Sequence, residues 1–394
     1  MKHRVTNKIN EIIAELRGVN IQNDIGILSG NSGIAMFFLQ YYQMSGNDKY
    51  FECIQKSVIH AIESINKGNN KFTFCGGITG LLWLVEDLIC KKLIDEKDIE
   101  FIDELENFLC EKMTQEMANG NYDYLHGSSG IALYFAKKNR RKDTSDFIEK
   151  YIRLLCSKAD YFSDGSIAWK SIVNIDKQNV GYNLSLSHGL ASIICILSKI
   201  FLSGYKTEKV EETIRGCVKY INKNKLKDNS KSFFPNWITL EDQNTFSRLA
   251  WCYGDLGIAI SLYYASKALE DINMENSSLE IFCHAALRRN LQDNHIVDAG
   301  ICHGTAGISH IFRRMFINTG LSLFTETADY WLDQTLKMAI HNDGLAGFKA
   351  YHGEKYGGWV KEYSILEGIS GIGLMLISSI NDCEPTWDEC LLLS

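Results

Sequence analysis

A short glycine pattern recurs seven times along the chain, and this repetition limits the possible folds more than any other feature of the sequence. Six copies read Gly-x-x-Gly followed by Ile or Leu, and in the remaining copy Ser192 replaces the second glycine. The first glycines of the copies lie at positions 30, 77, 127, 189, 254, 304 and 368. A pattern repeated over the whole chain indicates that one supersecondary unit is repeated.

The segments that follow the glycine turns differ in character from those that precede them. Each turn opens a short stretch of apolar and small residues, such as IALYFA or IAISLYYASKAL, which is typical of a helix buried on all sides. The intervening stretches, such as DTSDFIEKYIRLLCSKA, have one apolar and one charged face. Each repeat is therefore predicted to contain one inner and one outer helix, with glycine allowing the helix ends to approach closely.

The first and last repeats are as apolar and as rich in glycine as the middle ones, which favours a closed arrangement. An open solenoid, the alternative, usually carries polar capping repeats at its ends. We expect an all-α fold of the (α/α)7 toroid class, with seven inner and seven outer helices in a single domain over 1–394. Polar stretches near 161–184 and 226–247 are predicted to be small loop or β insertions. The Ser192 copy is the turn where tight packing is least expected.

The composition of the chain limits which classes of partner and which cellular compartment are expected. The chain has 41 Lys and Arg against 48 Asp and Glu, a net charge of −7, so no basic field recommends a nucleic acid as partner. Neither an export signal nor a transmembrane segment is evident in the sequence. Twelve irregularly spaced cysteines fit a reducing compartment. We expect a cytoplasmic protein, with peripheral membrane association through a complex as the alternative.

Two cysteines occupy the same position in neighbouring repeats. Cys252 and Cys302 each lie two residues before a first glycine, and His303 follows Cys302. Two thiolates and one imidazole suit zinc, and three protein ligands leave the fourth tetrahedral position open for a substrate thiol. Buried structural cysteines are the alternative. The dipeptide Cys283-His284 has no glycine turn beside it and is expected to be part of the core.

These motifs together resemble the lanthionine synthetase C-like family. The resemblance rests on WCYGxxG at 251–257, CHGxxG at 302–307 and NLSLSHG at 183–189, and the seven repeats extend it over the whole chain. It implies a stand-alone lanthipeptide cyclase that binds one zinc ion per chain through Cys252, Cys302 and His303. The implied reaction is a Michael-type addition of peptide cysteine thiols to dehydroalanine or dehydrobutyrine, which forms lanthionine or methyllanthionine rings.

The resemblance also implies four catalytic residues, each of which has a structural alternative. By motif they are His188, Arg248, Asp123 and Tyr253. His188 could instead satisfy a buried carbonyl, and Tyr253 could simply pack and donate a hydrogen bond. Arg248 and Asp123 could be structural ion partners, because buried charges are normally paired. His126, which no motif match supports, is expected at the same mouth.

The implied substrate is a dehydrated precursor peptide with a leader, supplied by a dehydratase and removed by an exporter of the same pathway. We hypothesise that the two polar insertions form an edge on which the leader docks. We expect no fused dehydratase or kinase. Alternatives are a family member that joins glutathione to dehydrated residues, a glycosidase using Glu367 and Asp123, and a non-catalytic scaffold that binds peptide.

Overall fold

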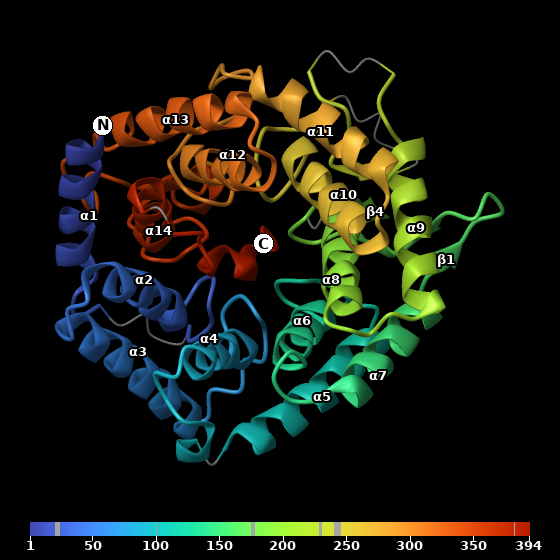
Figure 1. The fold of residues 1–394 in the computed structure, drawn as a ribbon, viewed down its shortest axis with the longest axis horizontal. Helices are drawn as coiled ribbons and strands as arrows, with labels where there is room; N and C mark the ends of the chain where they lie inside the picture. The colour runs from blue at the N-terminus through green and yellow to red at the C-terminus, as the bar shows by residue number, and fades with distance from the viewer. Residues whose placement is uncertain (20–23, 100, 175–177, 228–230, 240–245, 382) are drawn as a thin grey trace. The chain divides into compact units, whose positions relative to one another are not determined.

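Seven of the helices begin directly after a glycine turn, as the repeat predicts (Figure 1). The structure, a computed structural model, describes residues 1–394 except 20–23, 100, 175–177, 228–230, 240–245 and 382. Its described part contains fourteen α-helices. The seven inner helices are α2 (Asn31–Ser45), α4 (Ile78–Cys90), α6 (Ser128–Lys138), α8 (Leu190–Leu202), α10 (Asp255–Leu269), α12 (Thr305–Thr319) and α14 (Ile369–Ile380).

The other seven helices alternate with these along the chain and are amphipathic. They are α1 (Lys2–Leu16), α3 (Lys49–Asn66), α5 (Ile102–Ala118), α7 (Ser145–Ser157), α9 (Glu208–Lys223), α11 (Ile272–Ala286) and α13 (Ser322–Lys337). In α9 a helical stripe that includes Val210, Ile214, Cys217 and Ile221 is buried, whereas in α8 every residue from 190 to 200 is buried. The predicted pairing of one inner and one outer helix per repeat is confirmed.

Close backbone contact explains why the turns contain glycine. A Cβ atom on Gly77 would lie 2.1 Å from the carbonyl oxygen of Lys71, six residues earlier. The second glycine is crowded at the same spacing, since a Cβ on Gly80 would lie 2.2 Å from the Phe74 oxygen. The equivalent distance at Gly371 is 1.9 Å, so no other residue fits without moving the backbone.

The turn with Ser192 closes like the others, so the expected loosening is absent. The Gly189 N–H donates to the Ser185 carbonyl over 3.1 Å, as the Gly127 N–H does to the Asp123 carbonyl in the preceding repeat. The Ser192 hydroxyl is buried and donates to the Gly189 carbonyl over 2.7 Å. A local side-chain hydrogen bond therefore satisfies the extra polar atom.

The chain divides into two compact units. The terminal unit comprises Met1–Leu84 and Asn290–Ser394. In it α14 packs against α1, α2 and α12, so the last repeat lies directly beside the first (Figure 1). The backbone continues this contact, because the Leu366 N–H donates to the Leu28 carbonyl over 3.2 Å. An open array, whose end repeats lie apart, does not account for this neighbourhood.

The central unit, Val85–Arg289, contains the predicted insertions. In it α10 packs against α8 and α11. The first insertion forms a two-stranded sheet of β1 (Asp160–Tyr161) and β2 (Ile167–Ala168), followed by β3 (Lys170–Asn174) and β4 (Asn179–Asn183). The second supplies β5 (Trp237–Ile238), which pairs with β4, while its residues 228–230 and 240–245 lie outside the described residues. A single domain over 1–394 stays a prediction.

The terminal unit contains most of the remaining regular structure. It contains the hairpin of β6 (Ala350–Tyr351) and β7 (Trp359–Val360) and the 3-10 helices η2 (Glu354–Tyr356) and η3 (Trp387–Leu391), whereas η1 (Glu96–Asp98) belongs to the central unit.

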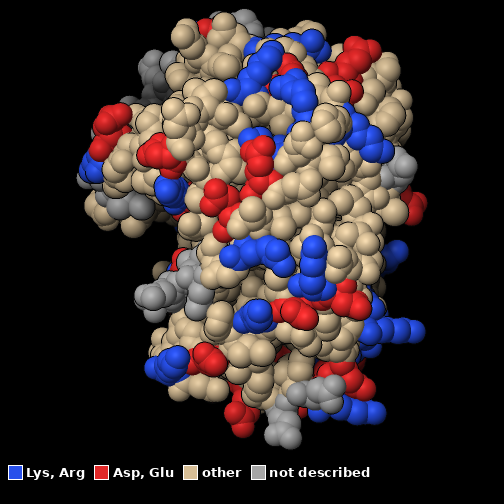
Figure 2. All heavy atoms as spheres, turned by 90° about the vertical axis from the view of Figure 1, so that its left-hand side faces the viewer, with Lys and Arg blue, Asp and Glu red and all other residues tan. Residues whose placement is uncertain are grey.

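Basic and acidic side chains are interspersed on the face shown in Figure 2. Arg4 of α1, for example, pairs with Asp333 of α13 over 3.1 Å. Within the described residues, no helix is both long and apolar enough to cross a membrane.

The backbone contact at the glycine turns predicts a large difference between two conservative substitutions. Gly80→Ala should destabilise the fold by roughly 3 kcal/mol, because the new Cβ would also lie 2.3 Å from the Ile27 nitrogen. Ser192→Ala, the control, should cost about 1 kcal/mol or less, since it removes one local hydrogen bond. Urea unfolding of both variants measures the difference; equal unfolding midpoints would contradict the steric explanation.

Candidate active site

The residues just before each first glycine form a common register. In the central unit the position directly before the glycine holds His126, His188 and Tyr253, and in the terminal unit it holds Ser29, Gly76, His303 and Glu367. Backbone hydrogen bonds connect neighbouring turns at this level. The Leu186 N–H donates to the Cys252 carbonyl over 3.1 Å, and the Cys302 N–H donates to the Leu366 carbonyl over 2.7 Å. The fold thus fixes the backbone from which these side chains extend.

His188 and Asp123 form a direct pair, although they come from different repeats. The Nδ1 atom of His188 lies 2.6 Å from Oδ2 of Asp123. The other carboxylate oxygen, Oδ1, accepts the backbone N–H of His126 over 2.7 Å. Asp123 therefore both closes its own turn and orients the imidazole. This leaves Nε2 as the ring nitrogen of His188 that can meet a substrate.

The pair stabilises its charged form. Burial is the largest influence on Asp123 and opposes the carboxylate, but the hydrogen bond and charge of His188, together with His126, outweigh it and lower the pKa of Asp123. Burial likewise opposes the imidazolium, yet the hydrogen bond to Asp123, its charge and that of Cys252 raise the pKa of His188. Between these two pKa values the pair is ionised and stabilises the fold; this contribution is lost at lower pH as Asp123 protonates and at higher pH as His188 deprotonates.

Two further aromatic side chains flank His188. The ring of His126 is stacked on it at a centroid distance of 6.0 Å, and the ring of Tyr253 lies 6.2 Å away. The Tyr253 hydroxyl is 3.5 Å from the Asn183 amide nitrogen, and burial raises the pKa of Tyr253, so the hydroxyl stays protonated and can donate. The structure thus places His126 beside the predicted residues, where no motif had assigned it a role.

Arg248 differs from the other predicted residues in making no ion pair or side-chain hydrogen bond with any residue that the structure describes. It is half-buried, and it lies six residues before Gly254, whose φ of +94° favours glycine. Its backbone carbonyl would contact a Cβ at Gly254 at 2.4 Å. The alternative reading of Arg248 as a structural ion partner therefore has no support from the described residues.

In the terminal unit a buried carboxylate organises the turn that carries Cys302 and His303. Asp298 is 3 % exposed and accepts the backbone N–H groups of Gly300 and Tyr351, each over 3.0 Å. Its Oδ2 atom lies 3.8 Å from Nε2 of His303. A carboxylate beside the second nitrogen of a ligand histidine is a common feature of metal sites. Asp298 was not among the predicted site residues, although it lies six residues before a first glycine, as Asn121 and Asn183 do.

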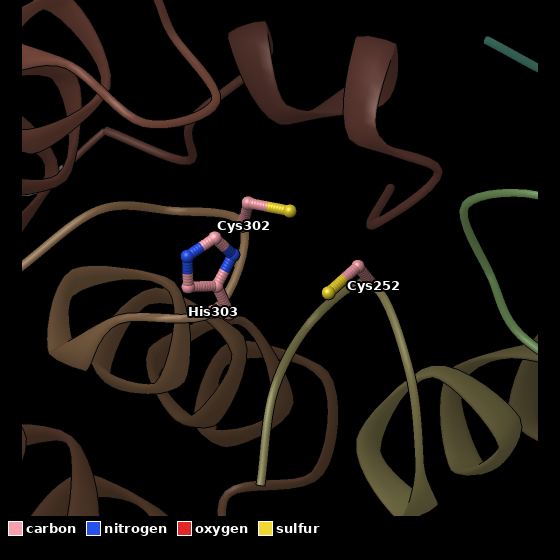
Figure 3. Close-up of side chains that lie close together, drawn as sticks. All are labelled: Cys252, Cys302 and His303. Atoms are coloured by element: carbon pink, nitrogen blue, oxygen red, sulfur yellow. The ribbon is translucent and has the colours of Figure 1, made fainter. Parts of the chain in front are cut away.

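The structure brings together the three predicted metal ligands. The candidate ligand atoms of Cys252, Cys302 and His303 all lie within 4.8 Å of one another, and Figure 3 shows the three side chains facing one another. By contrast, Cys283 and His284 lie within α11 and not at a glycine turn, but both are only half-buried, so the expectation that they belong to the core is wrong. None of the twelve cysteines, all of which lie in the described part of the chain, forms a disulfide bond.

A second carboxylate–histidine pair was also missed. Glu367, which the sequence suggested only as a glycosidase carboxylate, lies 2.9 Å from Nε2 of His352, which follows the strand β6. A signal for Glu367 existed, because it occupies the same register position as His303. For His352, which follows no glycine turn, the sequence carried no such signal.

Comparison with known proteins agrees with this arrangement. The family model for lanthionine synthetase C-like proteins matches residues 22–392. The chain belongs to the lanthionine synthetase C-like family. It is 24 % identical to the nisin biosynthesis protein NisC of Lactococcus lactis subsp. lactis, over all of this chain and 96 % of that protein. The predicted family is thereby confirmed.

The fold comparison covers the same range. The solved structure of nisin cyclase matches with a TM-score of 0.79 at 21 % identity, over all of this chain and 97 % of that one. This likeness, together with seven inner and seven outer helices, confirms the predicted all-α fold class, the (α/α)7 toroid of lanthionine synthetase C-like proteins.

The Asp123–His188 pair predicts how a single substitution changes a titration. Asp123→Asn should lower the pKa of His188, because the hydrogen bond and charge that raise it are removed. The His188 ring should then lose its proton at lower pH, which NMR measures from its ring signals. Asp160→Asn is the control, since that carboxylate contacts Tyr182 instead and should leave His188 unchanged. An unaltered His188 titration in Asp123→Asn would contradict the pairing.

Proposed function

We propose that this lanthionine synthetase C-like protein is a zinc-dependent lanthipeptide cyclase. Its reaction would be a Michael-type addition of peptide cysteine thiols to dehydroalanine or dehydrobutyrine, which closes lanthionine and methyllanthionine rings. The observation that carries the proposal is the convergence of Cys252, Cys302 and His303 in a chain of this family. Incubation with a dehydrated precursor peptide tests it: thiols open to alkylation should disappear as rings close, without a change in mass.

The donor set fits one zinc ion per chain. Zinc takes sulfur and nitrogen ligands in a tetrahedral arrangement, whose donors lie about 3.5 to 3.8 Å apart given its usual bond lengths. The candidate ligand atoms of the three residues lie within 4.8 Å of one another. Cys252, Cys302 and His303 would hold the ion, whose charge would favour the thiolate form of a substrate thiol. Asp298 would orient His303 for this role.

His188 is the proposed acid of the reaction. Addition of sulfur to the β-carbon leaves an enolate, which must receive a proton at the α-carbon. Asp123 holds Nδ1 of His188 and favours the imidazolium, so Nε2 can deliver that proton. Asp123, whose Oδ2 atom lies 2.6 Å from Nδ1 of His188, is thus a positioning residue.

Arg248 and Tyr253 are proposed to stabilise the developing negative charge. The Arg248 guanidinium is engaged by no described carboxylate, so it is available to a substrate carbonyl or enolate oxygen. Tyr253 has a protonated hydroxyl beside His188 and can donate to the same group. Hydrogen-bond donors aimed at developing charge are often the largest contribution to catalysis.

The proposed chemistry implies partners of the same pathway. A precursor peptide with a leader must first lose water from serine or threonine, so a dehydratase is proposed to act before this protein and an exporter after it. A cytoplasmic location, with peripheral membrane association through such a complex, belongs to the same proposal. Adding glutathione to the assay distinguishes the alternative activity, because an adduct increases the peptide mass whereas a ring does not.

Zinc content tests the ligand assignment. Purified protein should contain about one zinc per chain, and Cys302→Ala should lose most of it because only two ligands remain. Cys283→Ala is the matched control, a cysteine also followed by histidine, and should keep full occupancy. Metal analysis of the three proteins decides the matter; full zinc in Cys302→Ala would show that the assignment is wrong.

Substitution of the proposed acid should separate binding from chemistry. His188→Asn should keep zinc and peptide affinity but close rings roughly 100-fold more slowly, or with scrambled stereochemistry, because protonation would no longer be directed. Thiol alkylation follows the rate, and chiral analysis of the hydrolysed product follows the stereochemistry. A wild-type rate together with wild-type stereochemistry would move the role to His126 or Tyr253.

A further inference from the structure

A cleft in the central unit opens directly on the Asp123–His188 pair. Its volume is about 460 Å³. One wall is the turn 119–123, and the opposite wall comes from the strands β3 and β4 of the first insertion. Asp123 and His188 both line it. Any group that fills this cleft therefore lies beside the proposed acid.

The strand wall presents an apolar surface. Ile172 of β3 and Val180 of β4 are cross-strand partners, so their side chains lie on the same face of the sheet. Both line the cleft, and they are 51 % and 58 % exposed. Covering such a pair removes apolar surface from water, which favours a ligand with an apolar side chain.

The strands are tied to the turn that carries Asp123. The buried Tyr122 hydroxyl donates to the Trp169 carbonyl over 3.0 Å, and Trp169 directly precedes β3. The indole N–H of Trp169 donates in turn to the Leu155 carbonyl of α7 over 2.8 Å. Buried hydrogen bonds therefore connect the strand wall of the cleft to the turn that carries Asp123 and to α7.

One basic and one acidic side chain, Lys170 and Asp123, line the cleft. Lys170 lines it on the strand side, and its ammonium group lies 3.6 Å from the Asp160 carboxylate. The carboxylate that lines the cleft, Asp123, is already engaged by His188 and by the His126 amide. The volume of the cleft lies at the lower end of the range of ligand pockets, roughly 300 to 1,000 Å³. The cleft therefore suits one side chain with its flanking backbone and not a whole leader.

We propose that this cleft is a specificity subsite, which receives an apolar side chain of the precursor peptide next to the dehydrated residue under attack. This inference rests on the proposed function and extends it. Peptides with Leu or Ile beside the reacting residue would be positioned with the α-carbon at His188, whereas Ala or Asp at that place would leave the Ile172–Val180 pair uncovered.

Ile172→Asp tests the proposal, because the side chain is exposed and the substitution should not disturb the fold. Wild-type protein should cyclise a peptide with Leu at the flanking position about tenfold better, in kcat/KM, than one with Ala. In Ile172→Asp this preference should disappear, with zinc content unchanged. Ile272→Asp is the matched control, an isoleucine that is 62 % exposed on α11 outside the cleft, and it should retain the tenfold preference.

Binding measurements separate failure of this inference from failure of the proposed function. The same peptides with Ala in place of the dehydrated residue cannot react, so the difference in affinity between the peptides with Leu and with Ala at the flanking position reports on the cleft. Loss of the Leu preference in Ile172→Asp supports the subsite even if wild-type protein closes no rings, an outcome that would overturn only the cyclase proposal. If Ile172→Asp binds the peptide with Leu as much better than the peptide with Ala as wild-type protein does, the subsite proposal is wrong. The same holds if Ile172→Asp keeps this preference and only binds a leader-only peptide more weakly.

Discussion

The close contact of each glycine turn with the carbonyl six residues before it is the constraint on which the rest of this structure depends. At Gly77 and Gly371 a Cβ would lie 2.1 and 1.9 Å from a carbonyl oxygen, so these turns cannot accommodate a larger residue in the same geometry. The turn fixes where each inner helix begins. It also fixes the one or two residues before the glycine, because their backbone is hydrogen-bonded to the neighbouring turn. The steric requirement at the glycine therefore also sets the positions from which these side chains extend.

The candidate catalytic and metal-binding residues occupy these positions in several repeats. The same register position presents His188, Tyr253 and His303, and the position before it presents Cys252 and Cys302. Soft ligands and titratable groups thus extend from backbone that the helices hold in place, which is what a preorganised site needs. The side chains of different turns then interact, as Asp123 does with His188. The repeat supplies positions, and the individual residues at those positions supply the reaction.

Hydrogen bonds from the backbone stabilise the functional carboxylates. Asp123 accepts the His126 amide, and Asp298 accepts the amides of Gly300 and Tyr351. Each carboxylate then has one oxygen facing a histidine, at 2.6 Å in one case and 3.8 Å in the other. Backbone amides thus hold each carboxylate in place, so that it can orient an imidazole.

The sequence by itself determined the seven turns, the inner and outer helices and the identity of the candidate ligands. These follow from local rules: glycine is required where a Cβ does not fit, apolar periodicity marks buried faces, and cysteines in the same register extend from equivalent backbone. Only the tertiary structure decided which side chains meet. The contact of Asp123 with His188, the availability of Arg248, and the pairing of Glu367 with His352 depend on how separate segments pack to within a few ångströms. The cleft beside His188 is of the same kind, because it exists only where an insertion folds back over a turn, and no local pattern in 161–184 encodes that distance.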